Sequence, residues 1–291
     1  MSPNRIDQRI LRIAVVGLGA LSVIVLVLTL ANTRTSASNA TRATAGSAIP
    51  TPTSVPPTPM PMVNVPAGDF IMGSSISDAQ AAGAEKPQHT VYLDAFQIDK
   101  YEVTNALYKQ CVDAGKCYAP STWSSYTRNT YYGDPSFDNY PVINVSWYDA
   151  KAYCEWAGKQ LPTEAQWEKA ARGTDGRIYP WGNTWDATKL NSLVSNSSPG
   201  DATAVGSYPA GASPFGALDM AGNVWEWVAD WYGPSYYSHS PTRNPQGPSS
   251  GQYKAMRGGS WDNGMADARV ANRDYGVPIY FYAHLGFRCV K

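Results

Sequence analysis

The sequence predicts an α+β domain with a large irregular content, preceded by one transmembrane helix. Three observations support this prediction: an uncharged apolar run near the N-terminus, three capped helical segments, and a chain after Gly173 that holds turns and short strand patterns. Ten Trp and nineteen Tyr, with abundant Gly and Pro, indicate a fold held by aromatic packing rather than by long helices.

The apolar run covers residues 13–31 and carries no charge. It is long enough to cross a hydrocarbon core, which needs about 20 apolar residues. Arginines are concentrated in residues 1–12, so the positive-inside rule places that segment in the cytoplasm and the chain after Ala31 outside. The alternative is a cleaved signal peptide with residues 36–40 as the cleavage site; the length of the run favours a retained anchor.

Residues 32–61 are rich in Ala, Thr, Ser and Pro, and they have too few apolar side chains to pack a core. We therefore predict a stalk, followed by a folded domain at residues 62–291. Its start alternates like a short strand before a glycine turn, and residues 89–103 form a second strand region.

Each predicted helix has a Ser or Thr cap before it and a glycine after it. The helices cover residues 105–114, 147–157 and 164–172. Gln166 completes a capping box with Thr163 in the last of them. Further along the chain, residues 204–209 and 223–228 are short strand candidates.

Four cysteines on the outer side of a membrane favour two disulfides, and they allow three pairings. Cys111 and Cys117 are close in sequence and flank the glycine at a helix end, so a local bridge is favoured there. Cys154 then pairs with Cys289, which ties the C-terminus to the middle of the domain.

Composition argues against several classes of function. The 23 basic and 23 acidic residues give no net charge, so we predict no nucleic-acid partner. His89, His239 and His284 lie far apart without metal-site spacing. Ser207 and Ser260 sit beside glycines but outside a GxSxG context, so a serine hydrolase is not expected.

Residues 215–227, FGALDMAGNVWEW, have the character of a calcium loop. Asp219, Asn223 and Glu226 supply hard oxygen ligands, and Gly222 lets the chain curl so that main-chain carbonyls can face the same point. The alternative is a tight turn whose acidic side chains cap backbone N–H groups.

Seven motifs, in this order, resemble the formylglycine-generating enzyme family, also called the sulfatase-modifying-factor family. They are VNVPAGDFIMGS, DKYEVTNALY, YPVINVSWYDAKAYCEWAGKQLPTEAQWEKAARG, YPWGN, FGALDMAGNVWEW, RGGSW and LGFRC. They extend over residues 62–291, essentially the whole folded part. The resemblance implies a compact, irregular variant of the C-type lectin-like fold, and it implies the same bridge between Cys154 and Cys289.

The resemblance also implies where calcium binds. The first ion would be held by the side chains of Asp219 and Glu226 and the main-chain oxygens of Gly222 and Val224. A second ion would use Asn191 and Ser192, but Ser197 stands at its acidic position, so that site lacks one family ligand.

The loop RGGSWDNGMADARV, residues 257–270, decides whether the family's chemistry is retained. Family oxidases carry two cysteines after GGS and an aromatic residue, and these bind copper as soft thiolates that activate oxygen. Asn263 occupies the first position, and the second falls within residues 266–268, which contain no cysteine. Because an amide cannot replace a Cu(I)-binding sulfur, we expect no copper and no cysteine-dependent oxidase reaction.

The resemblance implies that this chain keeps the family's binding cleft, formed by Ser260, Trp261, Asn263 and Arg273. Residues 278–281 make one rim of this cleft apolar and aromatic. The predicted protein is therefore a single-pass membrane pseudoenzyme, its folded domain outside the cytoplasm, that binds a protein or a glycan or serves as a scaffold. One alternative is an accessory subunit of a larger membrane complex, with the anchor helix packed through residues 17–21. Another is an oxidase-type enzyme with altered metal chemistry.

Overall fold

The computed structural model describes residues 58–195 and 200–291, which form one compact unit. The predicted cytoplasmic segment, the anchor at residues 13–31 and the stalk up to residue 57 lie outside the described residues. Within the described part of the chain, no helix has the length and apolar character needed to cross a membrane.

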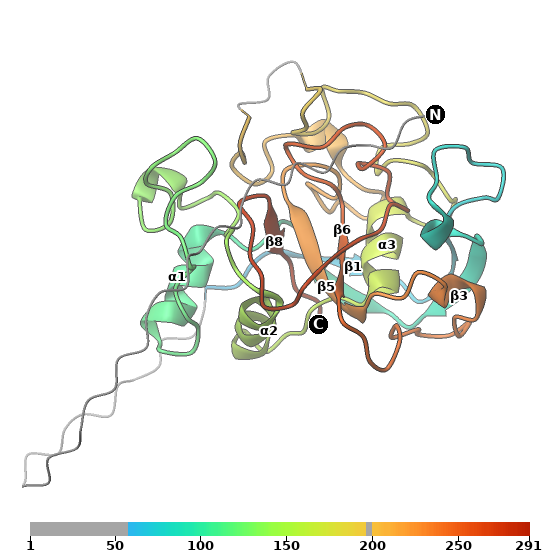
Figure 1. The fold of residues 1–291 in the computed structure, drawn as a ribbon, viewed down its shortest axis with the longest axis horizontal. Helices are drawn as coiled ribbons and strands as arrows, with labels where there is room; N and C mark the ends of the chain where they lie inside the picture. The colour runs from blue at the N-terminus through green and yellow to red at the C-terminus, as the bar shows by residue number, and fades with distance from the viewer. Residues whose placement is uncertain (1–57, 196–199) are drawn as a thin grey trace, which may run out of the picture. The chain divides into compact units, whose positions relative to one another are not determined.

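The first part of the domain consists of two antiparallel strand pairs (Figure 1). β1 (Met62–Val65) pairs with β4 (Phe96–Asp99), and β2 (Gly68–Met72) pairs with β3 (His89–Leu93). Side chains alternate between buried and more exposed positions along β2 and β3, so these strands have one face on the core.

The three α-helices begin at their predicted caps. They are α1 (Asn105–Asp113), α2 (Trp147–Trp156) and α3 (Glu164–Arg172). Thr104 caps α1, and Ser146 and Thr163 form capping boxes at the other two. Four short 3-10 turns complete the helical content of the described residues: η1 (Gly83–Glu85), η2 (Pro135–Phe137), η3 (Pro209–Gly211) and η4 (Tyr236–Ser238).

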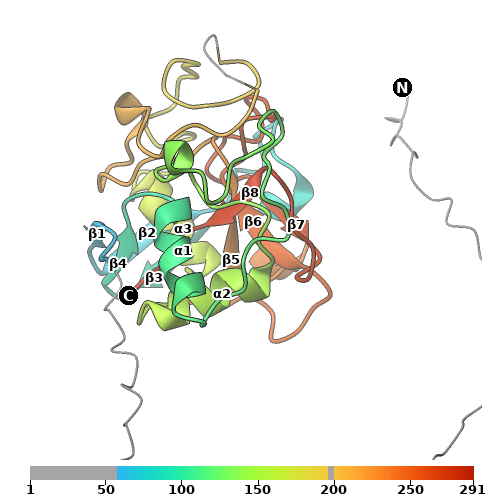
Figure 2. The same ribbon diagram turned by 90° about the vertical axis from the view of Figure 1, so that its left-hand side faces the viewer.

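A four-stranded sheet in the order β7-β6-β5-β8 forms the second part of the domain (Figure 2). Its strands are β5 (Trp225–Trp231), β6 (Lys254–Arg257), β7 (Asp274–Gly276) and β8 (Leu285–Phe287). β5 and β8 are parallel, whereas the other neighbours are antiparallel. α3 contacts both this sheet and the β2–β3 pair, so it joins the two parts of the core.

The strand predicted at residues 204–209 is wrong. Gly206 has a φ of 75°, which an extended strand does not allow, and its N–H donates to Asp219 Oδ2 at 2.6 Å. Pro209 then opens η3. The mixed α/β architecture with a large irregular content is confirmed, and so are both disulfides, Cys111–Cys117 and Cys154–Cys289.

Candidate functional site

The glycine-flanked loop begins directly after β6. Gly258 and Gly259 have φ values of 101° and 72°, which favour glycine. A Cβ on Gly258 would lie 3.1 Å from the Trp167 ring, and one on Gly259 would lie 3.0 Å from the main-chain oxygen of Asp267. The chain therefore turns here without room for side chains, and the turn brings Ser260 to Asn263 over the start of β5.

Ser260 and Asn263 are held in a closed set of hydrogen bonds. The buried Ser260 Oγ lies 2.5 Å from both Asp262 Oδ1 and Asn263 Oδ1. Asn263 Oδ1 also accepts from Trp225 Nε1 at 2.8 Å, at the first residue of β5. The residue at the family's first cysteine position is thus a structural acceptor for an indole N–H.

Asp262 connects this loop to the segment before β8. Its Oδ2 lies 3.4 Å from His284 Nδ1, and the His284 ring stacks on Tyr282 with ring centroids 5.5 Å apart. Burial alone would raise the pKa of Asp262, but its contacts with His284 and Ser260 lower it below its ordinary value. The carboxylate form of Asp262 is therefore stabilised at the mouth of the loop.

Trp261 forms the inner wall of an aromatic surface. Its ring is buried and lies 5.0 Å, between centroids, from that of the exposed Tyr126. Its indole Nε1 is buried and has no hydrogen-bond partner in the described part of the chain. The exposed Leu193 is tied to the loop through its backbone, because its N–H donates to the main-chain oxygen of Asn263 at 3.0 Å.

Arg273 does not share the hydrogen bonds of the other three predicted cleft residues. Its guanidinium donates to both carboxylate oxygens of Glu164, at 2.7 and 2.8 Å, and to the main-chain oxygen of Ala84 at 2.7 Å. It also lies 4.1 Å from the Tyr237 ring centroid. Arg273 therefore anchors α3 to η1 inside the protein, because the buried Glu164 needs a cation.

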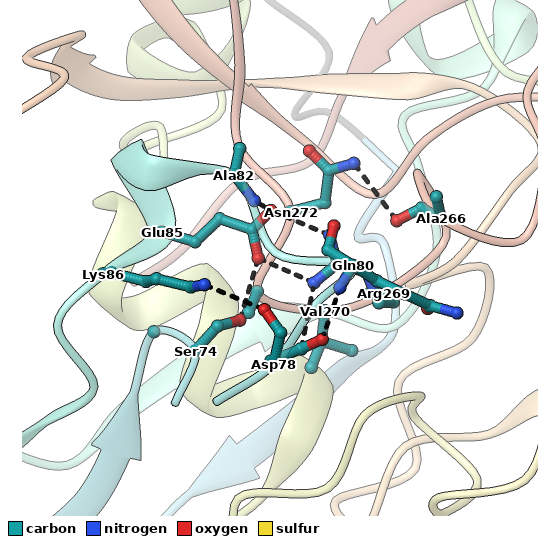
Figure 3. A network of polar contacts seen from close by, with 12 residues as sticks. Ser74, Asp78, Gln80, Ala82, Glu85, Lys86, Ala266, Arg269, Val270 and Asn272 are labelled. Carbon is teal, nitrogen blue, oxygen red and sulfur yellow. Dashed lines mark hydrogen bonds and ion pairs between the residues drawn. The ribbon is translucent and has the colours of Figure 1, made fainter. Parts of the chain in front are cut away.

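A second buried network fixes the far end of the loop (Figure 3). Arg269 donates to both carboxylate oxygens of Glu85, at 2.7 and 2.8 Å, and to the main-chain oxygen of Gln80. Asn272 donates to the main-chain oxygen of Ala266 at 3.2 Å. Because residues 266–272 are tied down in this way, the loop is held at both ends.

The predicted calcium loop has a strongly curled backbone. Asp219, Gly222 and Asn223 have φ values of 58°, 76° and 62°. A Cβ on Gly222 would lie 2.3 Å from the main-chain oxygen of Asn191, so only glycine fits. Asn223 donates to Glu102 Oε1 at 3.0 Å, which brings a distant acidic residue to the loop.

The carboxyl groups of three residues lie close to the guanidinium of Arg288 at this loop, and all four side chains are buried. The three are Glu102, Asp219 and Glu226. Both oxygens of Glu226 accept from Arg288 at 2.7 Å, and one also accepts from Trp167 Nε1 at 2.8 Å. Glu102 Oε2 is buried without a hydrogen-bond partner among the described residues. Within residues 58–195 and 200–291, no three His, Cys, Asp or Glu side chains are grouped to hold a metal by themselves.

Protonation compensates part of this excess negative charge. Burial, together with the charge of Asp219, raises the pKa of Glu102 well above its ordinary value. Burial also raises the pKa of Asp219 to about 6. The cluster therefore takes up either protons or another positive charge.

The side chains at the second predicted calcium position already form hydrogen bonds within the protein. Asn191 Nδ2 donates to the main-chain oxygen of Asp201 at 2.9 Å, while Asn191 Oδ1 is buried without a partner in the described part of the chain. Ser192 contacts Ser195 at 2.9 Å. Ser197, at the family's acidic position, lies outside the described residues.

No thiol is available to this site or to any other, because all four cysteines of the chain are in disulfides. Sequence reasoning missed Glu102, Arg288 and the contact between Asp262 and His284. The acidic Glu102 in DKYEVTN was one available signal, because an acid amid residues that pack a core needs a partner. The pairing of His284 with Asp262 has no local signal.

Comparisons with known proteins agree with the fold. The family model of the sulfatase-modifying factor enzyme 1-like domain matches residues 48–291. The formylglycine-generating enzyme of Streptomyces coelicolor is 35% identical, over 79% of this chain and 88% of the enzyme. Hercynine oxygenase of Mycolicibacterium smegmatis is 33% identical, over 75% of this chain and 58% of that protein. The structure of PvdO from Pseudomonas aeruginosa superposes with a TM-score of 0.67 and 26% identity, over 79% of this chain and 93% of PvdO.

Proposed function

This chain belongs to the family of sulfatase-modifying factor enzyme 1-like domains, and we propose that it is a member that binds or scaffolds rather than oxidises. In this proposal the domain lies outside the cytoplasm, held to the membrane by the apolar run at residues 13–31. Its partner is a protein or a glycan, engaged through the surface around the glycine-flanked loop.

The observation that carries this proposal is that every cysteine of the chain is in a disulfide. Copper-dependent oxidation in the family, as the resemblance implies, requires a pair of thiolates beside the loop. Here both bridges, Cys111–Cys117 and Cys154–Cys289, use up every cysteine. Asn263 offers an amide oxygen that already accepts from Trp225 and contacts Ser260. A soft cation has no soft ligand at this position.

The surface around the loop supports recognition. Two segments that contact the loop carry exposed apolar side chains, which we call the aromatic rim: Trp123, Tyr126, Ile279, Tyr280, Phe281 and Tyr282. Tyr126 reaches the loop through Trp261, and Tyr282 reaches it through His284 and Asp262. Tyrosine and tryptophan provide large contact areas at low entropic cost, as in the binding loops of antibodies.

Calcium is proposed at the curled loop, with ligands from the side chain of Asp219 and the main chain of Gly222 and Val224. The free Oε2 of Glu102 fits a cation there, whereas Glu226 is paired with Arg288 and would have to exchange that partner. The ion would neutralise the excess carboxylate charge and stabilise the curl. The unpartnered Asn191 Oδ1 is the corresponding feature at the weaker second position.

Two experiments test the proposed function. The full chain, incubated with a CxPxR-type peptide, copper and oxygen, should form no aldehyde above a metal-free blank; turnover would refute the non-oxidase assignment.

Separately, the full chain purified in mild detergent should retain a partner, and the double substitution Tyr280→Ser and Phe281→Ser should release it. Substitution of the exposed Tyr118, which lies outside the rim, is the matched control. Retention of the partner by the rim variant would refute the binding surface.

A further inference from the structure

A second concave site lies at the other end of β5 from the glycine-flanked loop. Asn263 contacts Trp225 at the start of this strand, whereas Ala229, near its end, lines a cavity of about 640 Å³. The remaining walls come from α2, from residues 158–161, from Gln166 of α3 and from Val290 and Lys291. The volume is in the range that binds small molecules, about 300–1,000 Å³.

The floor of this cavity is apolar and rigid. It consists of Trp147, Leu161, Ala229 and Val290. The Trp147 indole is fixed because its Nε1 donates to the main-chain oxygen of Val228 at 2.8 Å. The ammonium of the buried Lys254 also lies 3.9 Å from the Trp147 ring centroid. A flat or aliphatic ligand body would therefore meet a surface that is already ordered.

The rim of the cavity is cationic. Lys151, Lys159 and Lys291 all line it. Lys151 is paired with Glu155 and Lys159 with Asp99, each at 2.5 Å. An ammonium has three N–H donors, so each of these pairs leaves donors for a ligand.

Acidic groups at the rim limit its net charge. They are the side chain of Glu155, which lines the cavity, and that of Asp99, the partner of Lys159. Beneath the floor, burial lowers the pKa of Lys254 to about 8; Asp230 opposes this shift and Lys151 adds to it. The three lysines of the rim outnumber the carboxylates of Glu155 and Asp99, so the rim keeps a net positive charge that would attract an anion.

We propose that this cavity binds an amphipathic anion, a ring or short aliphatic body that ends in a sulfonate, phosphate or carboxylate. The apolar body covers Trp147 and Leu161, and the anionic group lies at the lysine rim. The site is separate from the cleft, so it does not depend on the proposed function. Because the lysines lie at the rim and the apolar side chains form the floor, the ligand enters with its apolar body first.

The test uses the full chain in mild detergent, with a detergent blank subtracted, and isothermal titration calorimetry. The probe is naphthalene-2-sulfonate, and its neutral control is naphthalene-2-methanol. We expect saturable binding of the sulfonate at one site, and about threefold or greater weakening for the neutral compound. Inorganic sulfate should not compete at equal concentration, because it lacks the apolar body. Equal affinity for the two naphthalenes, or no saturable binding, would refute the proposal.

Variants locate the binding. Lys151→Gln should lower affinity about threefold, whereas Lys109→Gln should not. Lys109 is a matched control because it too is half-exposed on a helix and paired with an acid four residues on. Leu161→Trp should abolish binding by filling the floor, and near-ultraviolet circular dichroism verifies that it folds.

A lysine footprint gives an independent readout. Acetic anhydride labelling, read by mass spectrometry, should show protection of Lys151 and Lys291 by the sulfonate and no protection of Lys109. Equal effects of the two lysine substitutions, or protection of Lys109 alone, would place binding elsewhere and overturn the assignment.

Discussion

The side-chain oxygen of Asn263 accepts a hydrogen bond from the indole Nε1 of Trp225 at 2.8 Å, between the glycine-flanked loop and the first residue of β5. In the family's oxidases this position holds a thiol, as the resemblance implies. Here the same position ties the loop to the sheet through this hydrogen bond.

Removal of that acceptor should destabilise the loop. Asn263→Ala leaves the Trp225 N–H and the Ser260 hydroxyl with fewer partners, and we expect a loss of about 1–3 kcal/mol in the free energy of unfolding. Urea denaturation followed by tryptophan fluorescence measures it. Asn263→Asp keeps an acceptor oxygen and should lose less; a larger loss for the aspartate variant would contradict this role.

The buried carboxyl group of Asp219 should make stability depend on pH. Burial raises its pKa from 3.8 to about 6, so between these values the folded state holds a proton that the unfolded chain has released. Stability therefore falls as pH rises through this window, by about 3 kcal/mol from this group when calcium is absent. Urea denaturation in EGTA at pH 4, 5, 6 and 7 measures the slope.

Asp219→Asn provides the comparison for that slope. Asp230 in β5, whose pKa burial raises to about 7, contributes in the same direction and remains in the variant. The difference between the two curves therefore reports Asp219 together with Glu102, whose pKa the charge of Asp219 raises. Parallel curves for the wild type and Asp219→Asn would show that this carboxyl group does not titrate with folding.

Calcium should replace the protons of the acidic cluster. At pH 7 the ion should stabilise the domain by about 2.7 kcal/mol at a hundredfold excess over its Kd, and by less at pH 5, where protons compete. Glu102→Gln should remove most of this effect because it removes the unpartnered oxygen. Thermal unfolding with and without calcium measures it. Glu155→Gln, on exposed α2 surface, is the control; no calcium effect in the wild type would reject the site.

The two disulfides should differ in how much they stabilise the protein. Cys154 and Cys289 are separated by 135 positions, and Cys111 and Cys117 by 6. On the chain-entropy model, loss of the long-range bridge costs about 5 kcal/mol and loss of the local one about 2 kcal/mol. Urea denaturation of the two double alanine variants measures the costs. A larger cost for the local bridge would contradict the model.

Arg273 should behave as a buried structural cation. Burial would raise the pKa of Glu164, but Arg273 and Arg257 together lower it, so both arginines hold it in its charged form. Arg273→Met should cost about 3–5 kcal/mol. Arg243→Met, which breaks an exposed pair with Asp94, should cost at most about 1 kcal/mol. Similar costs in urea denaturation would show that Arg273 is not essential to the network.

Local chemistry allowed much of this fold to be predicted. The helices begin at Thr104, Ser146 and Thr163 because each cap satisfies a backbone N–H within three residues. The bridge from Cys154 to Cys289 was predictable because the chain has four cysteines and a local bridge takes the other two, and because the family resemblance implies the same pair. By contrast, residues 204–209 looked like a strand but turn at Gly206, because Asp219 captures its N–H from a distant loop.

The sequence by itself determined the capped helices, the curled loop at Asp219 and the absence of cysteine at position 263, since these depend on residue type and short spacing. Only the tertiary structure decided what the charged groups do: Glu226 pairs with Arg288, Glu102 reaches Asn223, and Arg273 turns inward to Glu164. The physical reason is that a buried charge must find its partner in space, and such partners here lie 62 to 121 residues apart.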